Sequence, residues 1–167
     1  FQGNVEGNGE NRGGIVGDTS SGCEVSGCFV TGTVTGGKRV GGIAGYVSKP
    51  ISGSTEIKNC VSLAERVTGS NANRIAGEND ATLTNNYAWN GTKVNNATVS
   101  DNDAGGINGA ALTYENGTLS PQFSAIFGED NSAWEFTEDG LPILKDVGGT
   151  QSAYLPPYLT GEGFYGK

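Results

Sequence analysis

Acidic side chains are the residues of this chain that could do acid–base chemistry, because its 167 residues include no histidine. Without histidine, Ser-His-Asp triads, Cys-His pairs and His-Glu-x-x-His zinc sites are excluded. Paired carboxylates remain, and glycosidases use such a pair as acid and base. The closely spaced acids are Asp101 and Asp103, Glu129 and Asp130, and Glu138 and Asp139. Their neighbours have the composition of loops, so we interpret most of them as solvated turn residues and expect no catalytic residue and no enzyme.

The segment 101–106 resembles the start of a calcium-binding loop. Asp101 and Asp103 hold its first and third ligand positions, but Gly105 holds the fifth, and Leu112 stands where the closing Glu belongs. Two alternatives follow: a structural calcium held by the two Asp side chains, or an ordinary Asx-rich turn without metal. The sequence has no P-loop, no complete dinucleotide-binding fingerprint and no Cys-x-x-Cys pair, so we expect no other cofactor.

Three aromatic side chains could bind a sugar ring. Phe29, Tyr87 and Trp89 lie in short strand-like segments, and the period of two along a strand places all three on the outer face. One alternative is an open platform, since aromatic rings stack on the apolar faces of sugars. The other is that loops or the C-terminal segment cover this row, or that the alternation is shifted by one residue and the rings are core.

A repeated unit must position these side chains. A Gly-Ile-x-Gly stretch followed by a short strand recurs from Ile15 to Ile43, 28 residues on, and again to Ile75, 32 residues on, in a degraded third copy. A unit of this length cannot bury a core alone and must stack on its neighbours. The residues that the repeat selects for structure are Gly14, Gly17, Gly42 and Gly45 in the openings and Gly27, Asn59 and Asn85 at the next corner.

This corner column predicts backbone geometry. Gly and Asn tolerate positive φ best, so a Gly/Asn/Asn column indicates a left-handed corner in each repeat. Cys28 and Cys60 follow the corner at the same repeat position, which would stack them at a strand spacing of ~4.8 Å. With Cys23 as the third cysteine, two alternatives remain: a ladder of small buried thiols, or a disulfide that involves Cys23.

Together the patterns predict an all-β fold, a right-handed parallel β-solenoid of about three coils with a small C-terminal β cap. We expect a tag remnant at 1–3, repeats at 4–99, a cap at 100–149 and a tail or linker at 150–167. The cap is expected to end in a hairpin of 134–136 and 141–144. Because residues 5–7 read as the closing step of a repeat, we expect further repeats or another domain in the parent chain.

Composition narrows the range of partners. The net charge is −8, from ten Lys and Arg against eighteen Asp and Glu. A nucleic-acid partner requires a basic face, so we exclude nucleic acid. No apolar run approaches the ~18 residues of a membrane span, and the sequence shows no secretion signal.

The openings of the two good repeats read Gly14-Ile15-Val16-Gly17 and Gly42-Ile43-Ala44-Gly45, and 57–62 follows as Ile-Lys-Asn-Cys-Val-Ser. These stretches resemble the GLUG motif, a repeat of bacterial surface and secreted proteins that include adhesin-like chains. The resemblance covers roughly 4–94, with Arg74 in place of the first Gly of the third copy. It implies a parallel β-solenoid on or outside a bacterial cell, and it assigns no catalytic residues.

The expected function is therefore that of a non-catalytic, adhesin-like module, secreted or on the bacterial cell surface. It would bind a glycan or a host or other extracellular protein through a solenoid face. One alternative is a structural stalk or spacer that holds another domain away from the cell, and a third is a polysaccharide-active enzyme. Exposed aromatic side chains would favour binding, a polar face throughout would favour the stalk, and a close pair of acids in a cleft would favour the enzyme.

Overall fold

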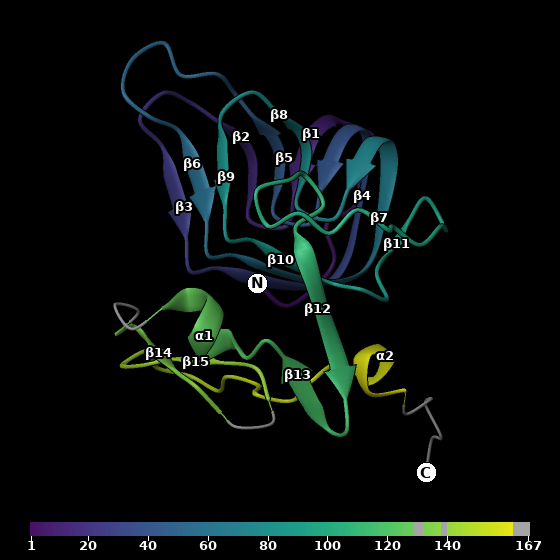
Figure 1. Cartoon of the computed structure of the whole chain (residues 1–167), viewed down its shortest axis with the longest axis vertical. Helices are drawn as coiled ribbons and strands as arrows, with labels where there is room; N and C mark the ends of the chain where they lie inside the picture. The colour runs from purple at the N-terminus through teal and green to yellow at the C-terminus, as the bar shows by residue number, and fades with distance from the viewer. Residues whose placement is uncertain (129–131, 138–139, 162–167) are drawn as a thin grey trace.

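Three sets of parallel strands make up the first half of the chain in the computed structural model, which describes residues 1–128, 132–137 and 140–161 (Figure 1). Each repeat contributes one strand to each set. The strands are β1 (Glu10–Gly13), β2 (Val16–Thr19) and β3 (Glu24–Ser26), then β4 (Phe29–Gly41), β5 (Ala44–Val47) and β6 (Glu56–Lys58), then β7 (Val61–Asn73), β8 (Ala76–Asn79) and β9 (Thr82–Thr84). The parallel pairs run β1-β4-β7, β2-β5-β8 and β3-β6-β9.

The second half adds shorter elements. They are β10 (Tyr87–Trp89), β11 (Lys93–Val94), β12 (Ala110–Glu115), β13 (Thr118–Ser120), helix α1 (Phe123–Phe127), β14 (Trp134–Glu135), β15 (Ile143–Leu144) and helix α2 (Pro157–Thr160). Strands β10 and β11 join β7, and β12 joins β10 in parallel before β13 returns antiparallel to it. The antiparallel pair β14-β15 forms the strands of the expected hairpin, whose turn at 138–139 lies outside the described residues.

The expected fold class, an all-β right-handed parallel β-solenoid with a small β cap, is wrong. The largest sheet has seven strands and is mixed, because β12 and β13 pair antiparallel, and two short helices belong to the fold. The C-terminal segment lies along the outer face of this sheet, below the repeats in Figure 1. The physical reason is the outward row of Phe29, Val61 and Leu63, which is apolar and becomes buried only when another layer packs on it.

Strand register follows the repeats. Val25 pairs with Ile57, and Ile57 pairs with Leu83.

The predicted left-handed corners are confirmed, with φ of 56° at Gly27, 52° at Asn59 and 51° at Asn85. A second column of positive φ, at Asn11, Arg39 and Asn71, was not predicted, since Arg is an unusual residue for that conformation.

Two of the three apolar clusters among the described residues lie on opposite faces of β4. The inner cluster lies between the three sheets and contains Val30, Ile43, Ile57 and Cys60, all fully buried. The outer cluster starts from Phe29 on the other face of the same strand and continues into the C-terminal segment. The alternation therefore has the predicted phase, with Val30 inward and Phe29 outward, and the outer row is covered.

The inner cluster leaves no room for side chains where successive repeats touch. A Cβ added to Gly42 would overlap the carbonyl oxygen of Arg74 and the hydroxyl of Ser62. In the third copy Arg74 takes the equivalent position, because loop 95–109 rather than another repeat follows. Its guanidinium is fully buried and donates to the carbonyls of Asn108 (3.0 Å), Asp101 (2.7 Å) and Gly109 (3.1 Å). The third copy is therefore the end of the array rather than a decayed repeat.

The tail docks on the sheet through Tyr158 of α2. Its hydroxyl donates to the carbonyl of Leu63 (2.7 Å) and accepts from the backbone N–H of Gly32 (2.9 Å). The parallel register of β4 and β7 shifts after Gly32, and the tyrosine satisfies a backbone group at this irregularity. Leu159 beside it is buried in the outer cluster.

We expect Tyr158→Phe to lower the free energy of unfolding by about 1–3 kcal/mol at neutral pH, because two buried backbone groups lose their partner. Burial raises the pKa of Tyr158 to about 12, so the folded protein holds this proton more tightly than the unfolded chain does. That stabilisation is present below about pH 10 and is lost as the pH rises toward 12. Denaturant unfolding of the parent chain and of Tyr158→Phe should therefore give free energies of unfolding that differ at pH 7 and converge between pH 10 and 12. A difference that stays the same at every pH would contradict this account.

Candidate ligand-binding site

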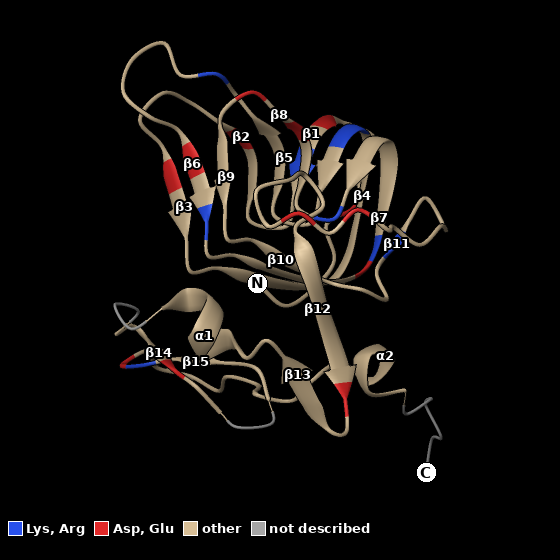
Figure 2. Ribbon diagram, viewed as in Figure 1, with Lys and Arg blue, Asp and Glu red and all other residues tan. Residues whose placement is uncertain are grey.

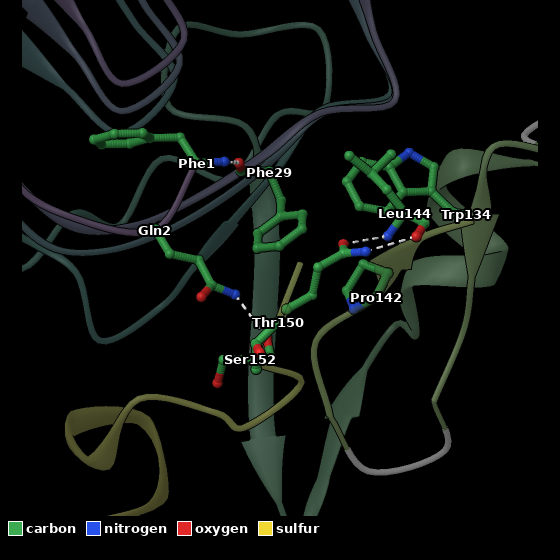
Figure 3. A pocket seen from close by; sticks show the side chains of 9 residues that line it. Phe1, Gln2, Phe29, Trp134, Pro142, Leu144, Thr150 and Ser152 are labelled. Atoms are coloured by element: carbon green, nitrogen blue, oxygen red, sulfur yellow. Dashed lines mark hydrogen bonds between the residues drawn. The ribbon is translucent and has the colours of Figure 1, made fainter. Parts of the chain in front are cut away.

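A pocket of about 270 Å³ lies between the N-terminal residues, the start of β4 and the β14-β15 hairpin (Figure 3). Its apolar side consists of Phe1, Phe29, Trp134, Pro142 and Leu144. Phe1 and Leu144 are partly open to solvent, with 49% and 36% of their surface exposed, whereas Phe29 is 4% exposed and forms the floor. The pocket therefore has a fixed aromatic base and an accessible rim.

Trp134 is the best-anchored side chain of this pocket. Its ring lies 5.5 Å from that of Phe29 and 5.7 Å from that of Phe127, measured between centroids. Its indole N–H donates to the carbonyl of Gly27 at 2.9 Å, which ties the hairpin to the first left-handed corner. The ring packing and the indole hydrogen bond already fix the Trp134 side chain. Binding of a ligand to this aromatic surface therefore costs little conformational entropy.

The side chains on the polar side of the pocket are uncharged. Gln2 donates to the carbonyl of Ser152 at 2.9 Å, and Gln151 makes two hydrogen bonds of 2.7 Å with the backbone of Leu144. Thr150 and Ser152 add hydroxyl groups. None of the described residues that line the pocket has an ionisable side chain. The terminal ammonium of Phe1 donates to the carbonyl of Phe29 at 2.8 Å, and burial lowers its pKa.

The aromatic row expected from the sequence does not form an open platform. Phe29 is buried, and Tyr87 and Trp89 are half-buried against the outer cluster. The Trp89 ring lies 5.5 Å from Tyr158 of the docked tail. Of the three, Phe29 alone lines the pocket.

Asp101 and Asp103 take part in the hydrogen bonds of loop 95–109. Asp103 accepts from the backbone N–H of Gly105 at 2.9 Å, as in an Asx turn, and the carbonyl of Asp101 accepts from Arg74. Within the described ranges, no group of three or more His, Cys, Asp or Glu could hold a metal ion. The pairs 129–130 and 138–139 lie outside these ranges.

Charged residues lie side by side on the neighbouring strands β3 and β6 (Figure 2). Lys58 of β6 lies 2.9 Å from Glu24 and 3.4 Å from Glu56. Another network centres on Arg39, which lies 3.1 Å from Glu78 and 4.8 Å above the ring of Tyr46. Because these groups pair with one another across successive repeats, we interpret them as support for the stacking rather than as a site.

No family model, curated protein or solved structure matches this chain. The resemblance to the GLUG motif thus stays a prediction that rests on the repeats themselves. No helix among the described residues has the length and apolar character needed to cross a membrane.

Sequence reasoning missed the pocket because its walls come from segments far apart in the chain. Gln2 meets Ser152 across 150 positions, and Trp134 meets Gly27 across 107. Of these residues, Gln2, Ser152 and Trp134 belong to no periodic pattern. The one available signal was the outward phase of Phe29, which indicated that some layer would pack there.

Proposed function

We propose that this chain is a non-catalytic binding module that holds a neutral carbohydrate in the pocket between β4 and the β14-β15 hairpin. The observation that carries the proposal is the combination of a fixed aromatic base, Phe29 with Trp134, and a rim of amides and hydroxyls without charge. Aromatic surfaces pack on the C–H faces of sugar rings, and amides and hydroxyls match sugar hydroxyls as donors and acceptors.

Size and charge narrow the ligand further. Small-molecule pockets usually measure about 300–1,000 Å³, so a pocket of about 270 Å³ suits a single sugar unit or the end of a glycan chain. An anionic sugar would require a cationic side chain, and none lines the pocket among the described residues. Among the described residues that line the pocket there is no Asp or Glu.

The setting that fits this activity is extracellular. The repeats resemble those of bacterial surface and secreted proteins, and a chain with net charge −8 has little attraction for nucleic acid. In that setting the module would attach to glycans, free or on a host protein, as an adhesin does. A stalk that spaces another domain from the cell is the account that remains if no glycan binds.

The test is retention on immobilised neutral polysaccharides and mucin, compared among the parent chain and two variants. Trp134→Ala should reduce affinity by about ten-fold or more, because it removes half of the aromatic base. Leu144→Asp should have a similar effect with little cost in folding, because it places a charge on the exposed rim. Tyr154→Ala is the matched control, since Tyr154 is an exposed aromatic, 88% accessible, that does not line the pocket.

Three results would contradict the proposal. Unchanged binding in both pocket variants would place the ligand elsewhere, and loss of binding in Tyr154→Ala alone would do the same. Retention on none of the polysaccharides would leave the stalk as the working function. Thermal unfolding of each variant separates lost binding from lost folding.

A further inference from the structure

We propose that Cys28 and Cys60 form a reactive dithiol that closes to a disulfide between the first and second repeats. The residues lie immediately before the paired positions Phe29 and Val61, at the entry to β4 and β7. The proposal is independent of the carbohydrate pocket.

Backbone geometry places the two residues within disulfide range. Parallel neighbours lie ~4.8 Å apart, and disulfides join Cα atoms ~4.4–6.8 Å apart. The backbone N–H of Val61 donates to the carbonyl of Cys28 at 2.9 Å, so the two chains are directly hydrogen-bonded at this level. Cys60 belongs to the inner cluster and Cys28 packs against it, which puts both side chains on one face.

The Cys60 thiol reaches from the second repeat into the first. The Cys60 thiol lies 3.2 Å from the carbonyl of Lys58 in its own repeat and 3.7 Å from the carbonyl of Val25 in the first repeat. The Cys28 thiol lies 3.2 Å from the carbonyl of Ser26 in that same first repeat. Cys60 therefore already reaches into the layer that Cys28 occupies.

Accessibility and acidity differ between the two thiols in the way that a stepwise reaction requires. Cys28 is half-buried at the outer end of the stack, whereas Cys60 is fully buried behind it. A hydrogen bond from Cys60, aided by the nearby Phe1 ammonium, outweighs burial and lowers the pKa of Cys28 to about 7. The same hydrogen bond and burial raise the pKa of Cys60. A thiol with a pKa near the ambient pH is the best nucleophile for disulfide exchange.

The reaction needs a low-molecular-weight disulfide as oxidant. The Cys28 thiolate attacks one of its sulfurs, forming a mixed disulfide and releasing one thiolate. Cys60 then loses its proton to solvent and attacks the Cys28 sulfur, which forms the Cys28–Cys60 bond and releases the second thiolate. Two electrons pass from the pair to the oxidant, whose S–S bond is reduced.

The experiment uses 5,5′-dithiobis(2-nitrobenzoate) near pH 7 on a Cys23→Ser chain, which keeps only the two thiols in question. We expect two thionitrobenzoates released per chain, no adduct retained, and a cross-linked Cys28–Cys60 peptide by mass spectrometry. With Cys60→Ser added, one should be released and the adduct should stay on Cys28. With Cys28→Ser added instead, the reaction should slow by at least about ten-fold, because Cys60 is buried.

An adduct that persists on Cys28 in the Cys23→Ser chain would overturn the proposal. So would equal reaction rates of the Cys28→Ser and Cys60→Ser variants. If a variant fails to fold, peptide mapping of the unmodified chain after incubation with glutathione disulfide still decides. A Cys28–Cys60 peptide supports the dithiol, and a pairing with Cys23 or none at all refutes it.

Discussion

Replacing Arg74 with Met is expected to lower the free energy of unfolding by about 2–3 kcal/mol. Arg74 is fully buried at the opening of the third repeat, and its guanidinium donates to three backbone carbonyls of loop 95–109. It also donates to the side chain of Asn102 at 2.9 Å. Methionine fills much of the same volume but leaves these buried acceptors without a donor, so the cost comes mainly from unsatisfied carbonyls rather than from a cavity.

The matched control is Arg66→Met. Arg66 lies on β7, the strand that ends just before Arg74, but it is exposed, so the change should cost less than about 1 kcal/mol. Urea unfolding of both variants measures the difference. Equal stabilities would mean that loop 95–109 does not depend on the guanidinium, and the interpretation of Arg74 as the end of the array would fail.

Replacing Gly42 with Ala is expected to destabilise the fold by about 3 kcal/mol or more, because the new Cβ overlaps backbone as well as a side chain. The overlapping atoms are the carbonyl oxygen of Arg74 and the hydroxyl of Ser62. Both lie in the next repeat, so relief would require that the second and third repeats separate. Ordinary overpacking is cheaper because a side chain can rotate away.

Gly148→Ala is the control for this change. Gly148 has open space around its Cα and no positive φ, so alanine there should leave stability within about 0.5 kcal/mol of the parent. Thermal unfolding followed by far-UV circular dichroism reports both variants. A Gly42→Ala chain that melts with the parent would show that the repeats are spaced more loosely than the structure has them.

The repeats made the first half of the structure predictable. Equivalent positions in successive repeats share one backbone conformation, so a Gly/Asn/Asn column was enough to identify the left-handed corner at Gly27, Asn59 and Asn85. The same logic gave the inward and outward phase of Val30 and Phe29. The second column of positive φ could not be predicted in this way. It contains Arg39, and an arginine does not indicate a positive φ.

The second half lacks a repeat, and there the prediction of an all-β fold class was wrong. The short helix α1 and the antiparallel return of β13 depend on which side chains pack on the outer face, such as Phe123 and Phe127 against Phe29. Packing of this kind is a tertiary property, and local sequence pattern does not encode it. The pocket depends on the same packing, so it could not be found before the fold was known.

The anchoring of Tyr158 also sets an order of events during folding. Its partner Leu63 lies 95 positions earlier, and contacts of such high sequence separation close late. As the chain leaves the ribosome, neighbouring repeats can pair at once. The apolar outer face at Phe29 stays exposed to solvent until residue 158 has been synthesised. A nascent chain halted before α2 would therefore expose a contiguous apolar sheet surface, which makes this stage of synthesis the one most in need of a chaperone.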